Sequence, residues 1–401
     1  MSEYINNQER RKKALKNIIA QLHEGKSVEE VKEQFDKEFN NVSANEISAA
    51  EQALIGEGVG IEEIQKLCDV HAAVFKGSIE EIHKETDQTK MPGHPVYILK
   101  KENRIIETWI EKHIRPFMNK ADNTVDNLKK GLNLLAKIDI HYSKKENLFF
   151  PYMEKYGITA PPKVMWGVDD EIRGMIKNSL IKLKEAGLLT DEIKLFIEST
   201  IEKALEMIYK EENIMLPMLL EVMSQEDWKI IADESSEIGY LYDNVPRWNP
   251  TIEKAVSDSV NNANELYGTI KLPSGVFQLN ELTHMLNILP FDITFVDKND
   301  KVKFFSEGSD RIFARTKAII GRDVSNCHPP ASVHVVQKIV EDFKSGKKDH
   351  EDFWIKMGSR YVYIRYFAVR DENNEYLGVV EITQNIKPIQ EIKDEKRLMS
   401  D

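Results

Sequence analysis

The chain has 401 residues, of which 41% are hydrophobic and 30% are charged, and its formal net charge is -12. This length allows roughly two to four folded domains, and the negative charge disfavours non-specific attraction to nucleic acid or to an anionic membrane. The two cysteines, Cys68 and Cys327, lie far apart, which is typical of a reducing compartment and not of a disulfide scaffold. Neither an apolar leader nor a run of about 18 apolar residues occurs. We therefore expect a cytoplasmic protein with no integral membrane segment and no nucleic-acid partner.

Residues 1–88 are predicted to form a small module of short helices. Three Ser-x-x-Glu sequences, which begin at Ser27, Ser43 and Ser78, are typical helix starts, because the serine and the glutamate each bond a backbone amide of the other. Apolar residues between them recur every three to four positions, as on one face of a helix. The sequence indicates no function for this module.

Residues 89–242 are predicted to form a four-helix bundle. The helical segments lengthen here to roughly 25 to 35 residues, with breaks near residues 119–123, 157–162 and 187–191. Long helices joined by short loops are typical of antiparallel bundles. A further helix is expected to begin at Ser224.

A weak internal repeat relates the second and fourth helices of this bundle. The segments KKENLFFP and KEENIMLP align without a gap. The alignment places Lys145 in the position of Glu211, and His141 in the position of Met207. The two helices are therefore expected to present related, but chemically different, side chains to the bundle interior.

The final third of the chain changes to a β pattern. Residues 243–275 hold prolines among polar residues and are predicted to be a linker around one short helix, and residues 276–401 to be an α+β domain. FDITFVDKNDKVKFFSEGS alternates apolar and polar residues on either side of a turn, which predicts a β-hairpin. Helical stretches follow, and then HEDFWIKM, RYVYIRYFAV and YLGVVEITQ, three predicted strands rich in β-branched and aromatic residues. The fold class is thus multidomain, with an all-α N-terminal module and bundle followed by an α+β domain.

Three segments resemble known families. HYSKKENLFFPYMEKYG at 141–157 and EENIMLPM at 211–218 resemble the hemerythrin HHE-type cation-binding bundle. FVDKNDKVKFFSEGSDRIFARTKAIIGRDVSNCHPP resembles the hairpin, helical middle and Gly-Arg turn of a PAS sensor domain. GVGIEEIQKLCDVHAAVFKGSIEEIH at 58–83 resembles the family called domain of unknown function number 438, whose members join the three modules in this order.

The hemerythrin resemblance implies a metal site, usually of iron, made by histidines and carboxylates that point inward from several helices. The family has a histidine on the first helix, a His-x-x-x-Glu on the second and similar ligands on the third and fourth. Three residues match this pattern: His94, His141 and Glu211. With one carboxylate from the third helix, Asp169, they are the metal ligands that we predict. Glu146 is turned away from this ligand face.

The chain departs from the family pattern within this site. Lys145 stands four residues after His141, where the family has an acid, and Met207 replaces the histidine of the fourth helix. A buried Lys145 facing Glu211 would place an ammonium where a metal would lie and would pair the charges without an ion. Two interpretations stay open: non-haem iron, and an inherited bundle in which His94 caps a helix.

The PAS resemblance implies a pocket between the sheet and the helical middle for a haem, a flavin or a small metabolite. Cys327, His328 and His334 lie in the helical middle, and thiolate and imidazole are common axial donors to haem iron. They are therefore the candidate cofactor ligands. In the alternative interpretation, Pro329 and Pro330 start a helix and His328 faces solvent.

The function that these features favour is a cytoplasmic sensor or signalling protein. It would detect oxygen, nitric oxide, redox state or a small metabolite through the metal site, the PAS pocket or both. It would dimerise through the PAS domain and act on an unidentified protein partner. The alternative is a non-haem iron protein that acts in metal handling, iron-centre repair, or oxygen or nitric oxide reduction; a third reading is a scaffold with both pockets empty. Without a phosphate-binding Gly-rich loop, a Gly-x-Ser-x-Gly elbow or a Cys-x-x-Cys motif, no catalytic residue and no enzyme activity are predicted.

Overall fold

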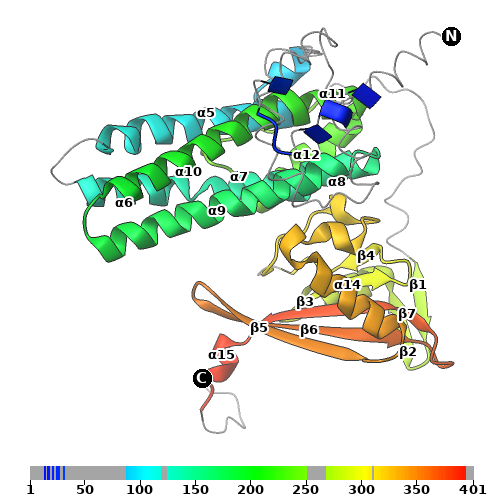
Figure 1. Ribbon diagram of the computed structural model, residues 1–401. Helices are drawn as coiled ribbons and strands as arrows, with labels where there is room; N and C mark the ends of the chain where they lie inside the picture. The colour runs from blue at the N-terminus through cyan, green and yellow to red at the C-terminus, as the bar shows by residue number, and fades with distance from the viewer. Residues whose placement is uncertain are drawn as a thin grey trace, which may run out of the picture. The chain divides into compact units, whose positions relative to one another are not determined.

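The computed structural model describes residues 87–118, 124–250, 268–308 and 311–393, together with a few residues between 13 and 31 (Figure 1). The chain divides into two compact units. We call the described residues up to 250 the helical unit and those from 268 onward the sheet unit, and describe each by itself. Within the described residues every helix is too short or too polar to cross a lipid bilayer.

Little of the N-terminal module is described. Ser27 and Glu30 form the predicted reciprocal cap, in which the Ser27 amide donates to Glu30 Oε2 at 2.8 Å and the Glu30 amide donates to Ser27 Oγ at 3.3 Å. The helix starts predicted at Ser43 and Ser78 lie outside the described residues.

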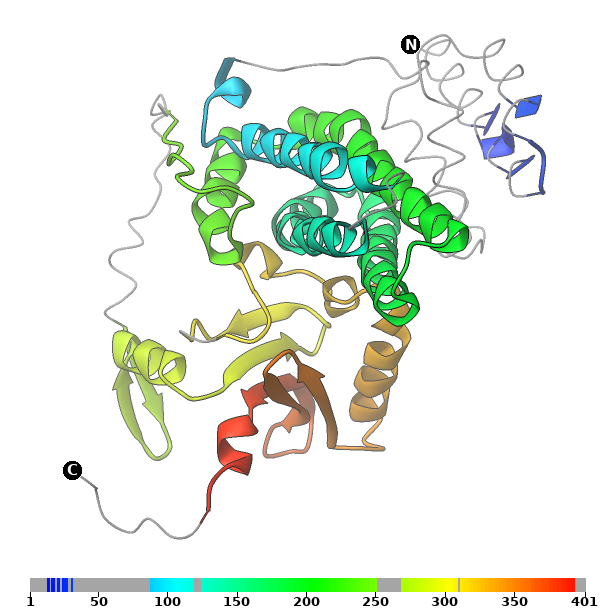
Figure 2. The same ribbon diagram turned by 90° about the vertical axis from the view of Figure 1, so that its left-hand side faces the viewer.

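The helical unit consists of long helical stretches, as predicted. In chain order they are η1 (Asp87–Lys90), α5 (Pro95–His113), η2 (Arg115–Phe117), α6 (Thr124–Leu135), α7 (Ile138–Lys144), η3 (Lys145–Phe149), α8 (Phe150–Lys155), α9 (Ala160–Ala186), α10 (Asp191–Lys210), η4 (Glu211–Met215), α11 (Leu216–Val222) and α12 (Gln225–Ile238). η3 and η4 are π-helical turns inserted into otherwise α-helical stretches. Figure 2 shows the helices of the bundle close to end-on.

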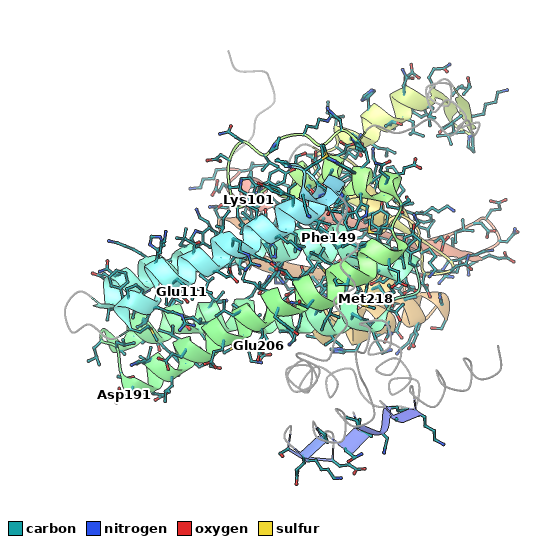
Figure 3. All side chains as sticks on the ribbon, turned by 90° about the horizontal axis from the view of Figure 1, so that it is seen from above. Lys101, Glu111, Phe149, Asp191, Glu206 and Met218 are labelled. Atoms are coloured by element: carbon teal, nitrogen blue, oxygen red, sulfur yellow. The ribbon has the colours of Figure 1, made fainter. Side chains whose placement is uncertain are left out.

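The bundle helices begin and end where the local sequence predicts. α9 ends at Gly187, which adopts the left-handed conformation with φ 66° that favours glycine. Thr190 caps α10 by accepting a hydrogen bond from the Ile193 amide. α12 starts after Ser224, which forms a capping box with Asp227. Figure 3 shows α5 beside α10 in opposite directions, since Glu111 lies toward the Asp191 end.

Residues of the predicted linker extend the helical unit. Trp248 is buried, and its ring centroid lies 4.5 Å from that of His94. A Cβ on Gly93 would come within 2.3 Å of the Pro246 carbonyl oxygen, so this close approach requires glycine. The chain after α12 therefore packs back on the start of α5. The short helix predicted in the linker would fall mainly in residues 251–267, outside the described residues.

The sheet unit has the predicted α+β fold. Its elements are β1 (Thr269–Leu272), β2 (Gly275–Gln278), α13 (Leu279–Asn287), β3 (Asp292–Asp297), β4 (Val302–Phe305), η6 (Lys317–Ile319), η7 (Val324–Cys327), α14 (Pro330–Lys344), β5 (His350–Met357), β6 (Arg360–Arg370), β7 (Tyr376–Asn385) and α15 (Lys387–Gln390). Five strands form an antiparallel sheet in the order β4-β3-β7-β6-β5. β1 and β2 form a separate hairpin, which was not predicted and which spans the boundary expected between residues 275 and 276.

Candidate functional site

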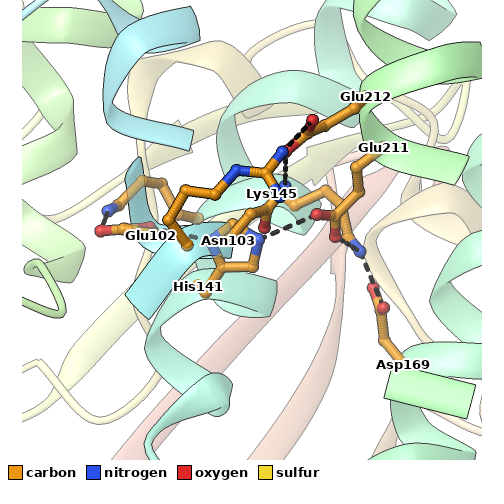
Figure 4. Close-up of polar contacts among 9 residues, drawn as sticks. Glu102, Asn103, His141, Lys145, Asp169, Glu211 and Glu212 are labelled. Atoms are coloured by element: carbon orange, nitrogen blue, oxygen red, sulfur yellow. Dashed lines mark hydrogen bonds and ion pairs between the residues drawn. The ribbon is translucent and has the colours of Figure 1, made fainter. Parts of the chain in front are cut away.

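A cluster of charged side chains lies in the interior of the helical unit. Five of its members come from five different segments, and all are buried: Glu102 on α5, His141 on α7, Lys145 on η3, Asp169 on α9 and Glu211 on η4. Each occupies a place on the buried stripe of its own helix, three or four residues from buried apolar neighbours. The helical periodicity that builds the core therefore also brings these side chains together (Figure 4).

His141 lies between two carboxylates. Its Nδ1 is 2.8 Å from Glu102 Oε2, and its Nε2 is 3.1 Å from Glu211 Oε2. Because an ionised carboxylate only accepts hydrogen bonds, the imidazole donates from both nitrogens when both contacts are made, and so carries a positive charge. Burial alone lowers the pKa of His141, but the charge of Glu211 and the hydrogen bond to Glu102 outweigh it and raise the pKa to about 9.

Lys145 lies between the other pair of carboxylates. Its Nζ donates to Glu211 Oε1 at 2.5 Å and to Asp169 Oδ1 at 2.8 Å, and it lies 4.3 Å from the centroid of the Tyr142 ring. Burial lowers the pKa of Lys145, whereas Asp169 and Glu211 raise it, with a net rise. The ammonium is therefore held in its charged form by carboxylates from two other helices.

The pKa values of the carboxyl groups in this cluster shift in opposite directions. Burial raises the pKa of Glu211, but the charges of Lys145 and His141 lower it to about 2. Burial raises the pKa of Asp169 well above its usual range, although Lys145 opposes the rise. Asp169 Oδ2 and the Tyr142 hydroxyl are buried without a hydrogen-bond partner. The site thus retains acceptor capacity that Lys145 leaves unused.

Glu102 links the cluster to the chain that follows α12. Its Oε1 accepts from Lys144 Nζ at 2.6 Å and from the Leu241 amide at 3.2 Å. The Tyr240 ring lies 4.5 Å from Lys144 Nζ, and the Tyr242 ring lies over Lys101. We call residues 239–243 the strap. Its backbone is held by the same carboxylate that bonds His141.

The predicted internal repeat has a structural counterpart in the two π-helical turns. The second residue of each turn is a glutamate that pairs with an arginine of a neighbouring helix: Arg173 binds both oxygens of Glu146 at 2.7 and 3.1 Å, and Arg104 lies 2.6 Å from Glu212 Oε2. The next residue of each turn is an asparagine that donates to the carbonyl four positions earlier. Glu146 is thus paired with Arg173, and its predicted displacement from the ligand face stays a prediction.

His94 lies outside the cluster. Its Nδ1 accepts from the Val96 amide at 3.1 Å, so it caps α5, as one of the two sequence interpretations held. Its ring packs against Trp228 and Trp248, and burial lowers its pKa to about 4. The structure therefore brings together His141, Asp169 and Glu211 but leaves His94 at the start of α5.

The donors of the cluster, as arranged, do not fit a metal ion. Across the described residues, no three His, Cys, Asp or Glu side chains are grouped in a way that could hold one. Lys145 occupies the space between Asp169 and Glu211, and both nitrogens of His141 face carboxylate oxygens. The assignment of metal ligands stays a prediction, and the structure shows an ammonium at the place where their side chains converge.

Sequence reasoning missed several members of this network. Glu102 sits on the apolar stripe of α5, three residues after Leu99 and four before Ile106, and a carboxylate in such a stripe was the signal that could have found it. Lys144, which binds Glu102, is also buried. Arg173 lies on α9 at i+4 from Asp169, but its sequence position carries no comparable signal.

The candidate cofactor ligands of the sheet unit lie at the end of η7, directly after it and on α14. Cys327 ends η7 and packs against the apolar cluster that contains Val296 and Ile319. His334 lies exposed on α14, which begins at Pro330, so the helix start predicted at the two prolines is present, whereas the predicted full exposure of His328 is not. His328 is partly exposed. Their role as haem ligands stays a prediction.

A cavity of about 630 Å³ opens in the sheet unit where α13, β3 and β7 meet. Its polar lining includes His284, Asn287, Asp292 and Thr383, and the candidate haem ligands are not among the described residues that line it. Asp292 is buried, and its Oδ2 accepts from the Ile312 amide at 2.7 Å. Burial raises the pKa of Asp292, although this amide hydrogen bond opposes the rise. The cavity therefore offers a buried carboxyl group among polar neighbours.

Three family models match the chain. Residues 15–81 match the family of unknown function DUF438, residues 94–219 match the hemerythrin HHE cation binding domain, and residues 282–387 match a PAS domain. This confirms the three predicted resemblances and their order along the chain. The cluster lies in the hemerythrin segment, and the cavity lies largely in the PAS segment.

Solved structures resemble parts of the chain. A C-terminal domain from Streptococcus mutans is 32% identical, with a TM-score of 0.31, over 32% of this chain and 99% of that one. A PAS domain from Colwellia psychrerythraea is 15% identical, with a TM-score of 0.22, over 27% and 98% of the two chains. A sensory box sensor histidine kinase from Vibrio cholerae is 12% identical, with a TM-score of 0.20, over 26% and 88%. The comparison with curated proteins found no match.

Proposed function

We propose that the chain is a cytoplasmic sensor or signalling protein whose input is a small polar molecule bound in the cavity of the sheet unit. The hemerythrin and PAS matches support a sensor or signalling role. The observation that carries the choice of input is the cavity of about 630 Å³ with Asp292 buried in its lining. The cluster of the helical unit, in contrast, already pairs its carboxylates with Lys145 and His141.

The lining of the cavity favours a ligand that donates hydrogen bonds or carries positive charge. Asp292 Oδ2 accepts from the Ile312 amide, and Arg311 lies 3.8 Å from Oδ1; a ligand amine or hydroxyl would add a further donor to this buried carboxyl group. His284, Asn287 and Thr383 offer further polar contacts at the same opening. A small amine-bearing or polyhydroxylated metabolite fits this chemistry better than a haem, whose large apolar ring would lie against the buried carboxyl group.

The test is the mass of the intact chain, isolated from cells and measured under non-denaturing conditions. We expect a small organic molecule bound to the native chain and absent from Gly308→Leu, because a Cβ at Gly308 lies 3.6 Å from Asn287 O and 3.7 Å from Asp292 Oδ1, between two lining residues. Gly275→Leu is the matched control, since a Cβ there meets nothing within 4 Å. No bound molecule in the native chain, or retention in Gly308→Leu, would contradict the proposal.

A non-haem iron protein is the second candidate, and the convergence of three predicted ligands is the observation that favours it. His141, Asp169 and Glu211 meet at one place in the hemerythrin segment, whose family is described as cation binding. Iron handling, iron-centre repair or reduction of oxygen or nitric oxide would require iron to displace Lys145. Stoichiometric iron that is lost in His141→Ala would support this candidate over the first.

A further inference from the structure

We infer that the ammonium of Lys145 takes the place of the metal ion in this bundle, and that removing it opens a cation site formed by His141, Asp169 and Glu211. The inference concerns the helical unit and does not depend on what the cavity of the sheet unit binds.

The position of the ammonium is the first step. Lys145 is completely buried, and its Nζ lies within 2.8 Å of one carboxylate oxygen from α9 and within 2.5 Å of another from η4 (Figure 4). A bundle metal site uses the same arrangement, with carboxylates from several helices directed at one point. A cation already occupies that point.

Charge is the second step. A divalent ion beside a buried ammonium would meet strong repulsion, because the interior screens charges far less than water does. His141 also carries charge when both of its nitrogens donate, and Lys144 lies on the other side of Glu102. The three carboxyl groups of the cluster thus already face three basic side chains.

The third step is a carboxylate oxygen that Lys145 leaves without a partner. Asp169 Oδ2 is buried and has no hydrogen-bond partner, so the ammonium satisfies only part of what these carboxylates offer. In many metal sites the metal-bound histidine donates its other ring N–H to a carboxylate, which orients the ring, and His141 Nδ1 already makes such a contact with Glu102. Imidazole and carboxylate together suit divalent iron, cobalt, manganese and zinc.

Cobalt titration of metal-free full-length chains tests this inference. Lys145→Glu removes the ammonium and adds a carboxylate, and we expect it to bind about one Co²⁺ per chain, seen by visible absorption and by intact mass. Lys145→Met removes only the ammonium and should bind more weakly. Lys144→Met is the matched control: it removes a neighbouring buried ammonium that pairs with Glu102, and, like the native chain, it should bind no Co²⁺ at this site.

A second substitution and a folding measurement keep the test decisive. Adding His141→Ala to Lys145→Glu should abolish binding. Helical circular dichroism shows which variants fold, and recovery of helicity on addition of Co²⁺ supports the inference for a variant that unfolds without it. Stoichiometric binding by the native chain that requires His141, or no binding by a folded Lys145→Glu or Lys145→Met, would overturn it.

Discussion

His141 holds the centre of the cluster, because each of its nitrogens faces an acid from a different helix. Glu102 comes from α5 and Glu211 from η4, so one ring ties together three parts of the bundle. Buried ionic groups of this kind stabilise a fold only while every partner is present. The residue-scale predictions follow from removing a proton or a partner.

Stability should depend on pH through His141 and Glu211. The folded-state pKa of His141, about 9, lies above its ordinary value of 6.5, so its contribution is complete below about pH 6.5 and is lost as pH rises through 9. The pKa of Glu211, about 2, lies below 4.5, so its contribution is complete above about pH 4.5 and is lost as pH falls through 2. The free energy of unfolding should fall by about 3 kcal/mol between pH 6 and pH 10, as measured by urea unfolding. If the free energy of unfolding of His141→Gln falls equally steeply at alkaline pH, the pH dependence does not come from His141.

Replacing Glu102 should destabilise the bundle and release the strap. Glu102→Ala leaves the buried Lys144 ammonium without its carboxylate and leaves the His141 imidazolium with one carboxylate, that of Glu211, instead of two, which should cost roughly 3–5 kcal/mol. The Leu241 amide loses its acceptor and should exchange with deuterium faster. Glu107→Ala, which removes a half-buried partner of the exposed Arg104 on the same helix, should cost less than about 1 kcal/mol and leave strap exchange unchanged. Equal effects of the two substitutions would show that Glu102 has no special role.

At the scale of elements, the packing of α5 against α6 depends on one glycine. A Cβ on Gly131 would lie 2.1 Å from the His113 carbonyl oxygen and 2.9 Å from Ile114 Cγ1. Gly131→Ala should therefore lower the free energy of unfolding by roughly 1–3 kcal/mol through overpacking. Gly174→Ala on α9, where a Cβ meets nothing within 4 Å, should raise it by about 0.5–1 kcal/mol. Thermal unfolding of the two variants side by side checks the prediction, and a stabilised Gly131→Ala would refute the close contact.

The strands predicted best from the sequence are those that are rich in β-branched and aromatic residues or that flank a turn. β5 begins and ends with HEDFWIKM, and the hairpin of β3 and β4 encloses the predicted turn. The hairpin of β1 and β2 was missed, because strands of four residues, most of them exposed, carry no alternation of buried and exposed positions. The π-helical turns were also missed as such, because an extra residue in a helical turn leaves little trace in apolar spacing.

The candidate site could be predicted only in part, because it is built from residues on different helices. The hemerythrin resemblance implied that His141 and Glu211 point inward, and Lys145 stands four residues after His141 on the same helix face; the predicted facing of Lys145 toward Glu211 is confirmed at 2.5 Å. Glu102 was missed because His94 seemed to supply the first helix's ligand, although it lies two turns before the level of the cluster. Tertiary packing decides which residues of different helices lie at the same height along the bundle. A single sequence does not show this packing.

At the scale of the whole molecule, we propose that the chain forms a homodimer through the edge strand β5. β5 pairs only with β6 in the sheet, and its side chains include Trp354, which is 62% exposed, and Met357, which is 38% exposed. An exposed edge with large apolar side chains is a common place for association. Sedimentation should show a native dimer that Trp354→Glu converts to a monomer. Leu195→Glu, at an equally exposed site on α10, is the control and should remain dimeric. A native monomer would contradict the proposal.

The two units of the chain differ in what their interiors hold. The helical unit carries its own cation at the centre of a hemerythrin-like bundle, and the sheet unit offers the cavity for a ligand. The strap follows α12, and the Leu241 amide within it donates to Glu102, so the carboxylate that bonds His141 also constrains the chain directly after α12.

Elemental analysis of the native full-length chain, isolated without oxygen from cells grown with added iron, tests the central claim most directly. We predict iron far below one atom per chain, because Lys145 already fills the point where Asp169 and Glu211 converge. One or two irons per chain that disappear in His141→Ala would contradict the account and favour an iron protein.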